Sequence, residues 1–154
     1  MDGRMFREML RPAKERLMKK EPKDIAARAD VEYDAETSEF RLKSLGKDVR
    51  MSWPDAEMLP VLEGWHHLVL LHYLYLADGA SLDALWMPLG QMKDGMIRGA
   101  GFDRQSAREL GTLLRDCTEE KMTEVFSALG GQMADSNADI CVILPFLPRF
   151  PVML

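Results

Sequence analysis

Hydrophobic and polar residues follow two different periods along the chain, and the change of period separates its segments. Near the N-terminus apolar residues recur every three or four positions, which predicts an amphipathic helix over residues 5–20. Pro22 then opens a second, short helix that runs through Ala29. Between residues 31 and 53 the period falls to two, with turn-forming residues between the runs. This stretch predicts a three-stranded antiparallel meander with one buried face and one face in water.

The segment over residues 63–79 is apolar on nearly every side of a helix. Gly79 lies just past its end, in a position where glycine commonly terminates helices. A helix without a polar face belongs in the middle of a soluble protein. We therefore expect Trp65–Ala77 to be a central helix with protein on all sides.

Further elements are predicted in the second half of the chain. Two amphipathic helices follow the candidate N-caps Asp103 and Thr118. The segment 85–89 is compatible with a short strand, which Pro88 would limit to an edge or an end. Residues 138–146 form an apolar run that is typical of a buried strand.

Helices and strands come in blocks that do not alternate strictly, which predicts an α+β fold. We expect a three-stranded antiparallel meander and one or more C-terminal strands, packed on the buried central helix and on flanking amphipathic helices. Residues 1–30 are expected to form an N-terminal helical segment that packs on a single α+β domain of residues 31–154.

Composition narrows the classes of function. The 154 residues carry 25 acidic and 20 basic side chains, a net charge of −5, which disfavours a general nucleic-acid binder. The N-terminus lacks the apolar core of a signal peptide, and Trp65–Ala77 is shorter than the ~20 residues that cross a bilayer. Cys117 and Cys141 lack the spacing of zinc or iron–sulfur ligands. We expect a cytoplasmic protein with two reduced thiols and no membrane partner.

The three histidines do not predict a metal site. No two of His66, His67 and His72 are four residues apart, so on a helix their side chains point in different directions. His72 has two interpretations. It is a neutral core histidine that bonds a backbone carbonyl or a tyrosine hydroxyl, or it faces a ligand in a pocket with Tyr75 and Asp78.

Motifs of nucleophilic catalysis and phosphate binding are missing. The chain has no GxSxG or SxxK motif, and its glycine-rich segment around residues 90–101 does not follow the phosphate-loop pattern. We therefore assign no catalytic residue, no metal and no cofactor from the sequence, and an enzyme is the less favoured class.

Four runs of residues resemble a known family, the domain of unknown function 3786. They are AKERLMKKEPKDIAARADVEYD, FRLKSLG, LLHYLYLADG and LGGQMADSNADICVILPFLPRFPV. The resemblance covers roughly residues 13–152. It is most specific at residues 70–79, where His72, Tyr73, Asp78 and Gly79 match the motif position by position.

The resemblance implies an α+β protein with a buried central helix, from an anaerobic bacterium or archaeon, and it supplies no reaction. Some relatives add an iron–sulfur segment, for which this chain has no cysteine cluster. Relatives usually continue beyond the final FPV with a tryptophan and an acidic stretch.

Three hypotheses for function follow. The leading one is a non-catalytic binding or accessory domain for an unknown small molecule or protein. The second is an enzyme or cofactor-handling protein with a pocket beside the helix of residues 63–78. The third is a homodimer formed through the apolar C-terminal strand.

Overall fold

The computed structural model describes residues 3–83, 85–92, 95, 99–138 and 140–154. The chain forms two compact units. The first contains Met1–Leu82 and Pro145–Val152, and the second contains Asp83–Leu144 and Met153–Leu154. The chain therefore leaves the first unit, builds most of the second, and then returns to the first.

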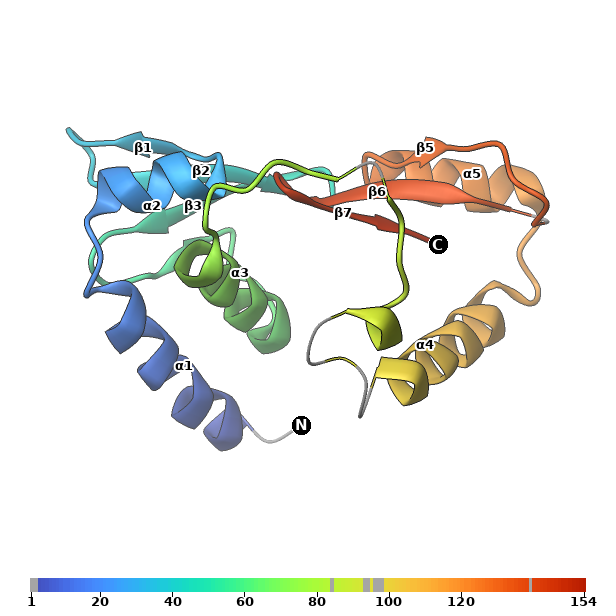
Figure 1. Cartoon of the computed structure of the whole chain (residues 1–154), viewed down its shortest axis with the longest axis horizontal. Coiled ribbons are helices and arrows are strands. Elements are labelled where there is room, and N and C mark those ends of the chain that lie inside the picture. The colour runs from blue at the N-terminus through green and yellow to red at the C-terminus, as the bar shows by residue number, and fades with distance from the viewer. Residues whose placement is uncertain (1–2, 84, 93–94, 96–98, 139) are drawn as a thin grey trace. The chain divides into compact units, whose positions relative to one another are not determined.

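The first unit combines three helices with a four-stranded sheet (Figure 1). The helices are α1 (Gly3–Leu17), α2 (Pro22–Ala29) and α3 (Gly64–Leu76). The strands are β1 (Glu32–Asp34), β2 (Glu39–Ser44), β3 (Lys47–Ser52) and β4 (Met58–Leu59), antiparallel and in the order β1-β2-β3-β4. The predicted meander is confirmed, and the two-residue strand β4 extends it.

Helices pack against one face of this sheet. Along β2 and β3 the buried residues alternate with exposed ones, as the period of two predicts. The buried face joins helical residues in one hydrophobic core, together with Leu147 from the returning segment. The largest fully buried apolar side chains of this core are Leu17, Ile25, Phe40, Val49, Met51, Leu70, Leu71 and Leu74.

Helix α3 is central in the first unit, but the expectation that protein surrounds it is wrong. Its buried residues, His66, Leu70, Leu71 and Leu74, lie on one side of the helix. On the opposite side Trp65 and Leu76 are 47% and 65% exposed. The reason is that α1, α2 and the sheet all pack on the same side of α3.

The second unit contains a short 3-10 helix η1 (Leu89–Gln91), helices α4 (Gly99–Leu114) and α5 (Glu119–Ala128), and strand β5 (Gln132–Met133). β5 pairs with β6 (Val142–Leu147), which neighbours β7 (Phe150–Met153). Both β6 and β7 contain residues of both units. The helices and the two antiparallel sheets confirm the α+β class.

Some local predictions hold and others fail. Thr118 caps α5 by accepting a hydrogen bond from the Lys121 backbone, and β6 confirms the predicted buried strand. Asp103 is not an N-cap, because α4 begins at Gly99 and the Asp103 carboxylate instead accepts from the Gly90 backbone at 3.2 Å. No strand forms in the described part of 85–89, where Leu89 enters η1.

Three further expectations concern the chain as a whole. Cys117 is half-buried and Cys141 buried, and both are free thiols. Among the described residues, no helix combines the length and apolar character of a transmembrane span. The proposed boundary at residue 30 stays a prediction.

Candidate functional site

The three residues singled out on α3 and just after it lie apart in their contacts. His72 is exposed, so it is not the core histidine of the first interpretation. The Tyr75 ring lies beneath Lys20, whose ammonium is 4.7 Å from the ring centroid and donates to the Tyr75 carbonyl. The Asp78 carboxylate accepts from the Ala80 backbone at 2.9 Å and stabilises the turn after α3. A pocket shared by His72, Tyr75 and Asp78 stays a prediction.

A groove of about 580 Å³ lies elsewhere in the first unit, beside strands β2 and β3. This volume suits a small molecule or a few residues of peptide. Its residues come from three segments: the entry to β1, strands β2 and β3, and the returning segment. They are Asp30, Val31, Glu32, Arg41, Leu42, Lys43, Asp48, Val49, Arg50, Pro145, Leu147 and Pro148.

The floor of the groove is formed by β2 and β3, and the tight turn between them sets their register. Leu45 and Gly46 both have positive φ, 49° and 73°, which is the two-residue hairpin turn that closes on a hydrogen-bonded pair, Ser44 and Lys47. Hydrogen-bonded and non-hydrogen-bonded pairs alternate along an antiparallel ladder. Lys43 opposite Asp48 and Arg41 opposite Arg50 are therefore non-hydrogen-bonded pairs, in which side chains approach most closely.

The first wall is made where α2 turns into β1. Asp30 adopts the left-handed conformation (φ 55°, ψ 49°) at the C-cap of α2, and its N–H bonds the Ala26 carbonyl. The Val31 N–H bonds the same carbonyl at 3.0 Å. This turn places Asp30, Val31 and Glu32 along the groove.

The second wall is the returning segment Pro145–Pro148, which the first unit holds firmly. Leu147 is buried in the core, and the Phe146 carbonyl accepts a hydrogen bond from Ser44 at 2.8 Å. One residue beyond the wall, the Arg149 N–H donates to the Tyr73 hydroxyl at 3.0 Å. The groove thus depends on residues more than 100 positions apart in the sequence.

Opposite charges face each other in the groove, but their pairing is loose. Lys43 and Asp48 are 3.7 Å apart, and Arg41 and Glu32 are 3.8 Å apart. Asp30 is 3.8 Å from Arg149 outside the groove. These separations exceed hydrogen-bond length, so the N–H groups and carboxylates retain bonding capacity for a ligand.

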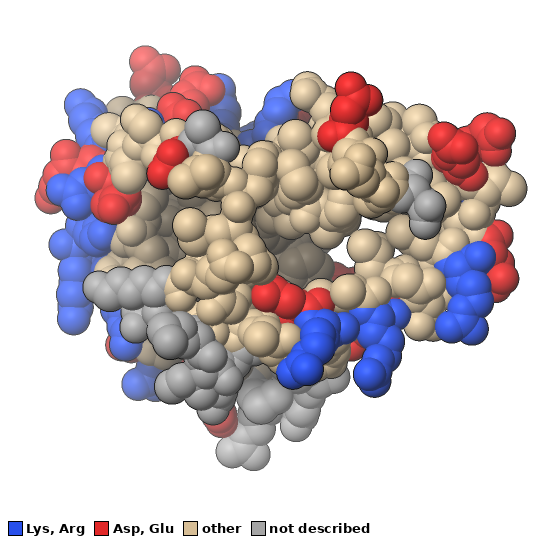
Figure 2. Space-filling view, turned by 45° about the vertical axis from the view of Figure 1, so that its right-hand side comes forward, with Lys and Arg blue, Asp and Glu red and all other residues tan. Residues whose placement is uncertain are grey.

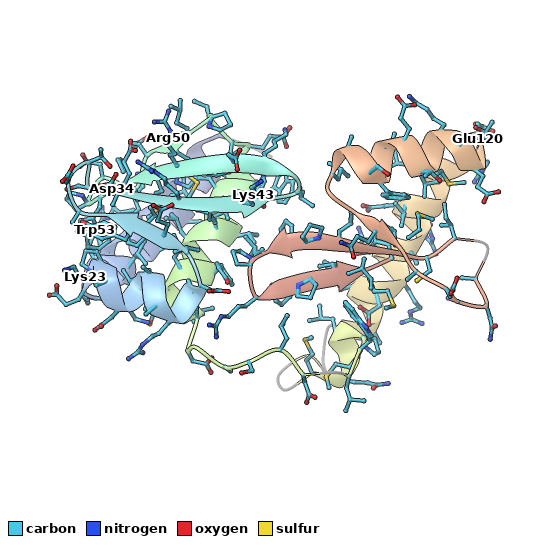
Figure 3. All side chains as sticks on the ribbon, turned by 90° about the horizontal axis from the view of Figure 1, so that it is seen from above. Lys23, Asp34, Lys43, Arg50, Trp53 and Glu120 are labelled. Carbon is cyan, nitrogen blue, oxygen red and sulfur yellow. The ribbon has the colours of Figure 1, made fainter. Side chains whose placement is uncertain are left out.

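One neighbouring pair is tight by contrast. Arg41 donates to Asp34 at 2.8 Å. Backbone N–H groups of Thr37 and Glu36, and more weakly Arg41, lower the pKa of Asp34, which keeps this carboxylate charged. Arg50 is held more loosely, 3.8 Å from Glu39, and Figure 3 shows Arg50 and Lys43 on neighbouring strands.

The backbone of Lys43 adds a donor and an acceptor. Since Lys43 and Asp48 form a non-hydrogen-bonded pair, the N–H and C=O of Lys43 point away from β3. They point to the side of β1, whose pairing with β2 begins only at Arg41. Within the described part of the chain, neither group has a hydrogen-bond partner. β2 therefore offers a short open edge beside the groove.

Ser44 and His66 form the most buried polar pair of the first unit, yet their geometry does not suit catalysis. The Ser44 hydroxyl donates its only proton to the Phe146 carbonyl, so His66 Nε2 must donate to Ser44 Oγ at 2.8 Å. An Nε2 that carries a proton cannot act as a base toward Ser44. Ser44 is also fully buried, so no substrate reaches it. The pair joins α3, β2 and the returning segment.

Part of the groove's lining could be predicted from the sequence. The alternation in β2 and β3 identified Arg41, Lys43, Asp48 and Arg50 as the wet face of the meander, and the Leu45–Gly46 turn would have given their register. Nothing local indicated the wall from the returning segment, because that contact spans the whole second unit.

Comparisons with known proteins agree with the resemblance found in the sequence. A model of the domain of unknown function family DUF3786 matches residues 21–154. Neither the curated proteins nor the solved structures gave a match. The family match includes β1–β4, α3 and the returning segment, and so every residue that lines the groove. The chain belongs to the DUF3786 family.

Proposed function

We propose that this protein is a non-catalytic binding domain whose groove in the first unit takes a ligand that carries both a positive and a negative charge. The observation behind the proposal is the balance of the groove itself. Its lining has three bases, Arg41, Lys43 and Arg50, and three acids, Asp30, Glu32 and Asp48.

A ligand of one sign would meet as much repulsion as attraction in such a groove. A ligand with both signs can place each charge beside an opposite one, and such complementarity favours one partner over another. Charges of both signs are also mixed over the first unit, at the left of Figure 2. The groove is therefore distinguished by its concave shape and open backbone, and not by a field of one sign.

A binding role fits the polar chemistry of the first unit better than catalysis. The buried histidine that faces a serine, His66, is a hydrogen-bond donor to it. The charged side chains that line the groove are all exposed, and its described lining includes no serine, cysteine or histidine.

The proposal is tested with glycylglycine, a small zwitterion, against acetate and methylammonium, which carry one charge each. In an NMR titration of the ¹⁵N-labelled full chain, we expect glycylglycine to shift the amides of Val31, Lys43 and Leu147. Acetate and methylammonium should need about tenfold higher concentrations. Equal shifts with acetate, or no shift with any probe, would contradict the proposal.

Variants locate the site. Arg50→Gln and Asp48→Asn each remove one charge from the floor and should weaken glycylglycine binding. Arg16→Gln is the matched control, since Arg16 is an exposed arginine of α1 outside the groove. Equal weakening by all three variants would point to a general charge effect and not to the groove.

A further inference from the structure

We infer that the ligand of this groove is an extended peptide segment, which hydrogen-bonds the open backbone of Lys43 and so adds to the edge of β2. This inference rests on the proposed function and names the class of its ligand. The observation behind it is that β1 pairs with β2 only as far as Arg41. The N–H and C=O of Lys43 are therefore left without a hydrogen-bond partner among the described residues.

A donor and an acceptor on one strand residue match the groups that an extended peptide presents. One residue of an antiparallel partner exchanges both hydrogen bonds with its opposite residue. Peptide recognition by strand addition takes its affinity from such main-chain bonds and its specificity from alternate side chains. Free carboxylates or amines offer only one half of this pattern.

Lys43 and Asp48 lie beside the open edge, on the face onto which alternate side chains of an added strand would point, whereas the edge at Arg41 is already paired with Glu32. Arg41 and Lys43 project from β2 onto the exposed face, and Asp48 and Arg50 from β3 onto the same face. A peptide with an acid and a base at positions i and i+2 directs both charges onto this face. The same two residues at i and i+1 direct them to opposite faces.

The walls limit the peptide to a short segment. Asp30–Glu32 lies at one end of the open edge, where β1 begins, and the Ser44–Lys47 turn closes the other end. Pro145 and Pro148 line the groove without backbone N–H groups of their own. They therefore supply apolar contact without competing donors.

The test uses the blocked tripeptide acetyl-Glu-Val-Lys-amide and its isomer acetyl-Glu-Lys-Val-amide. Both carry the same charges, and blocked ends remove the terminal ammonium and carboxylate. We expect the first to bind the full chain at least about fivefold more tightly by calorimetry, with NMR shifts at Lys43. Equal affinity of the two isomers would overturn strand addition.

Methylating the peptide nitrogens tests the backbone bond directly. In an added strand, successive N–H groups point alternately toward and away from β2. N-methylation at Glu or at Val should therefore weaken binding at least about tenfold in one analogue and leave it nearly unchanged in the other. Two analogues that bind as well as the parent would overturn the inference while the charge-based proposed function stands.

The protein side of the bond is tested at Lys43. Lys43→Ala removes the ammonium and keeps the N–H, whereas Lys43→Pro also removes the N–H, which the β3 ladder does not use. We expect Lys43→Pro to bind at least about tenfold more weakly than Lys43→Ala. If Lys43→Pro fails to fold, the N-methylated peptides still test the backbone hydrogen bond. Binding of glycylglycine without binding of acetyl-Glu-Val-Lys-amide would retain the proposed function and reject the peptide.

Discussion

The hydroxyl of Tyr73 accepts a hydrogen bond from the backbone N–H of Arg149 at 3.0 Å, across 76 positions of sequence. The same hydroxyl donates to the Ala29 carbonyl at 2.6 Å. Burial raises the pKa of Tyr73, so the hydroxyl keeps the proton that it donates. Tyr73 thus ties α2, α3 and the returning segment together. This is a structural role for a residue of the motif that the sequence shares with its family.

Tyr73→Phe should lower the free energy of unfolding by about 2 kcal/mol, because it leaves a half-buried carbonyl and N–H without their partner. Urea unfolding followed by circular dichroism measures the loss. Tyr75→Phe is the matched control on the same helix. Its Lys20 contacts use the ring and the backbone carbonyl, so a change of about 0.5 kcal/mol or less is expected. Similar losses in both variants would refute the assigned role.

Ser44→Ala should destabilise the chain by about 1–3 kcal/mol, since it leaves His66 Nε2 and the Phe146 carbonyl unpaired in a buried setting. Ser52→Ala is its control, because Ser52 accepts one exposed hydrogen bond, from the Glu57 backbone. Chemical denaturation of both variants gives the comparison. A smaller loss in Ser44→Ala than in Ser52→Ala would show that the buried network contributes little.

Stability should fall as the pH drops from neutrality toward 5. Burial lowers the pKa of His66, and the nearby positive charge of Lys47 lowers it further. Burial also lowers the pKa of His67, although the hydrogen bond to the Ala56 carbonyl acts in the opposite direction. The unfolded chain therefore takes up protons below its ordinary histidine pKa of about 6.5 while the folded chain does not. This stability is complete above about pH 6.5. It is lost progressively as the pH falls from there through the lowered folded-state values.

Each histidine contributes at most about 1.4 kcal/mol per pH unit to that slope. Urea unfolding at pH 7.5, 6.5 and 5.5 measures it, above the range in which most carboxylates titrate. His66→Gln and His67→Gln should each reduce the slope, since glutamine keeps a donor and does not ionise. A wild-type chain whose stability stays constant or rises over this range would contradict the assignment.

Two glycine substitutions in helices should act in opposite directions. A Cβ at Gly111 in α4 would meet nothing within 4 Å, so Gly111→Ala should stabilise the protein by up to about 1 kcal/mol through helix propensity. A Cβ at Gly64, at the start of α3, would lie 2.8 Å from the Phe6 ring, so Gly64→Ala should be destabilising. Thermal unfolding of the two variants measures both signs, and stabilisation by Gly64→Ala would contradict the packing of α1 on α3.

Local sequence signals predicted the elements whose causes are local. Pro22 opened α2, the period of two located β2 and β3, and Thr118 capped α5. The start of α4 was missed because Asp103 is a good N-cap by type, while its carboxylate bonds the backbone of Gly90.

The apolar helix shows a different limit of sequence reasoning. Residues 65–76 are hydrophobic on all sides, so no periodicity distinguished the buried side, with Leu70 and Leu74, from the exposed side, with Trp65 and Leu76. One wall of the groove could not be predicted from local sequence patterns either. The floor of the groove follows from register, but its second wall comes from a segment that local patterns cannot place.

The return of Pro145–Val152 into the first unit has a consequence for biosynthesis. While the ribosome is still translating the second unit, the core of the nascent first unit lacks Leu147. The hydroxyl of Tyr73 also lacks the hydrogen bond from the Arg149 N–H. The first unit cannot reach its final packing until the segment Pro145–Val152 has emerged from the exit tunnel. It therefore completes its packing only after most of the second unit has been translated, and chains stalled before residue 145 are expected to be preferred substrates of cellular proteases.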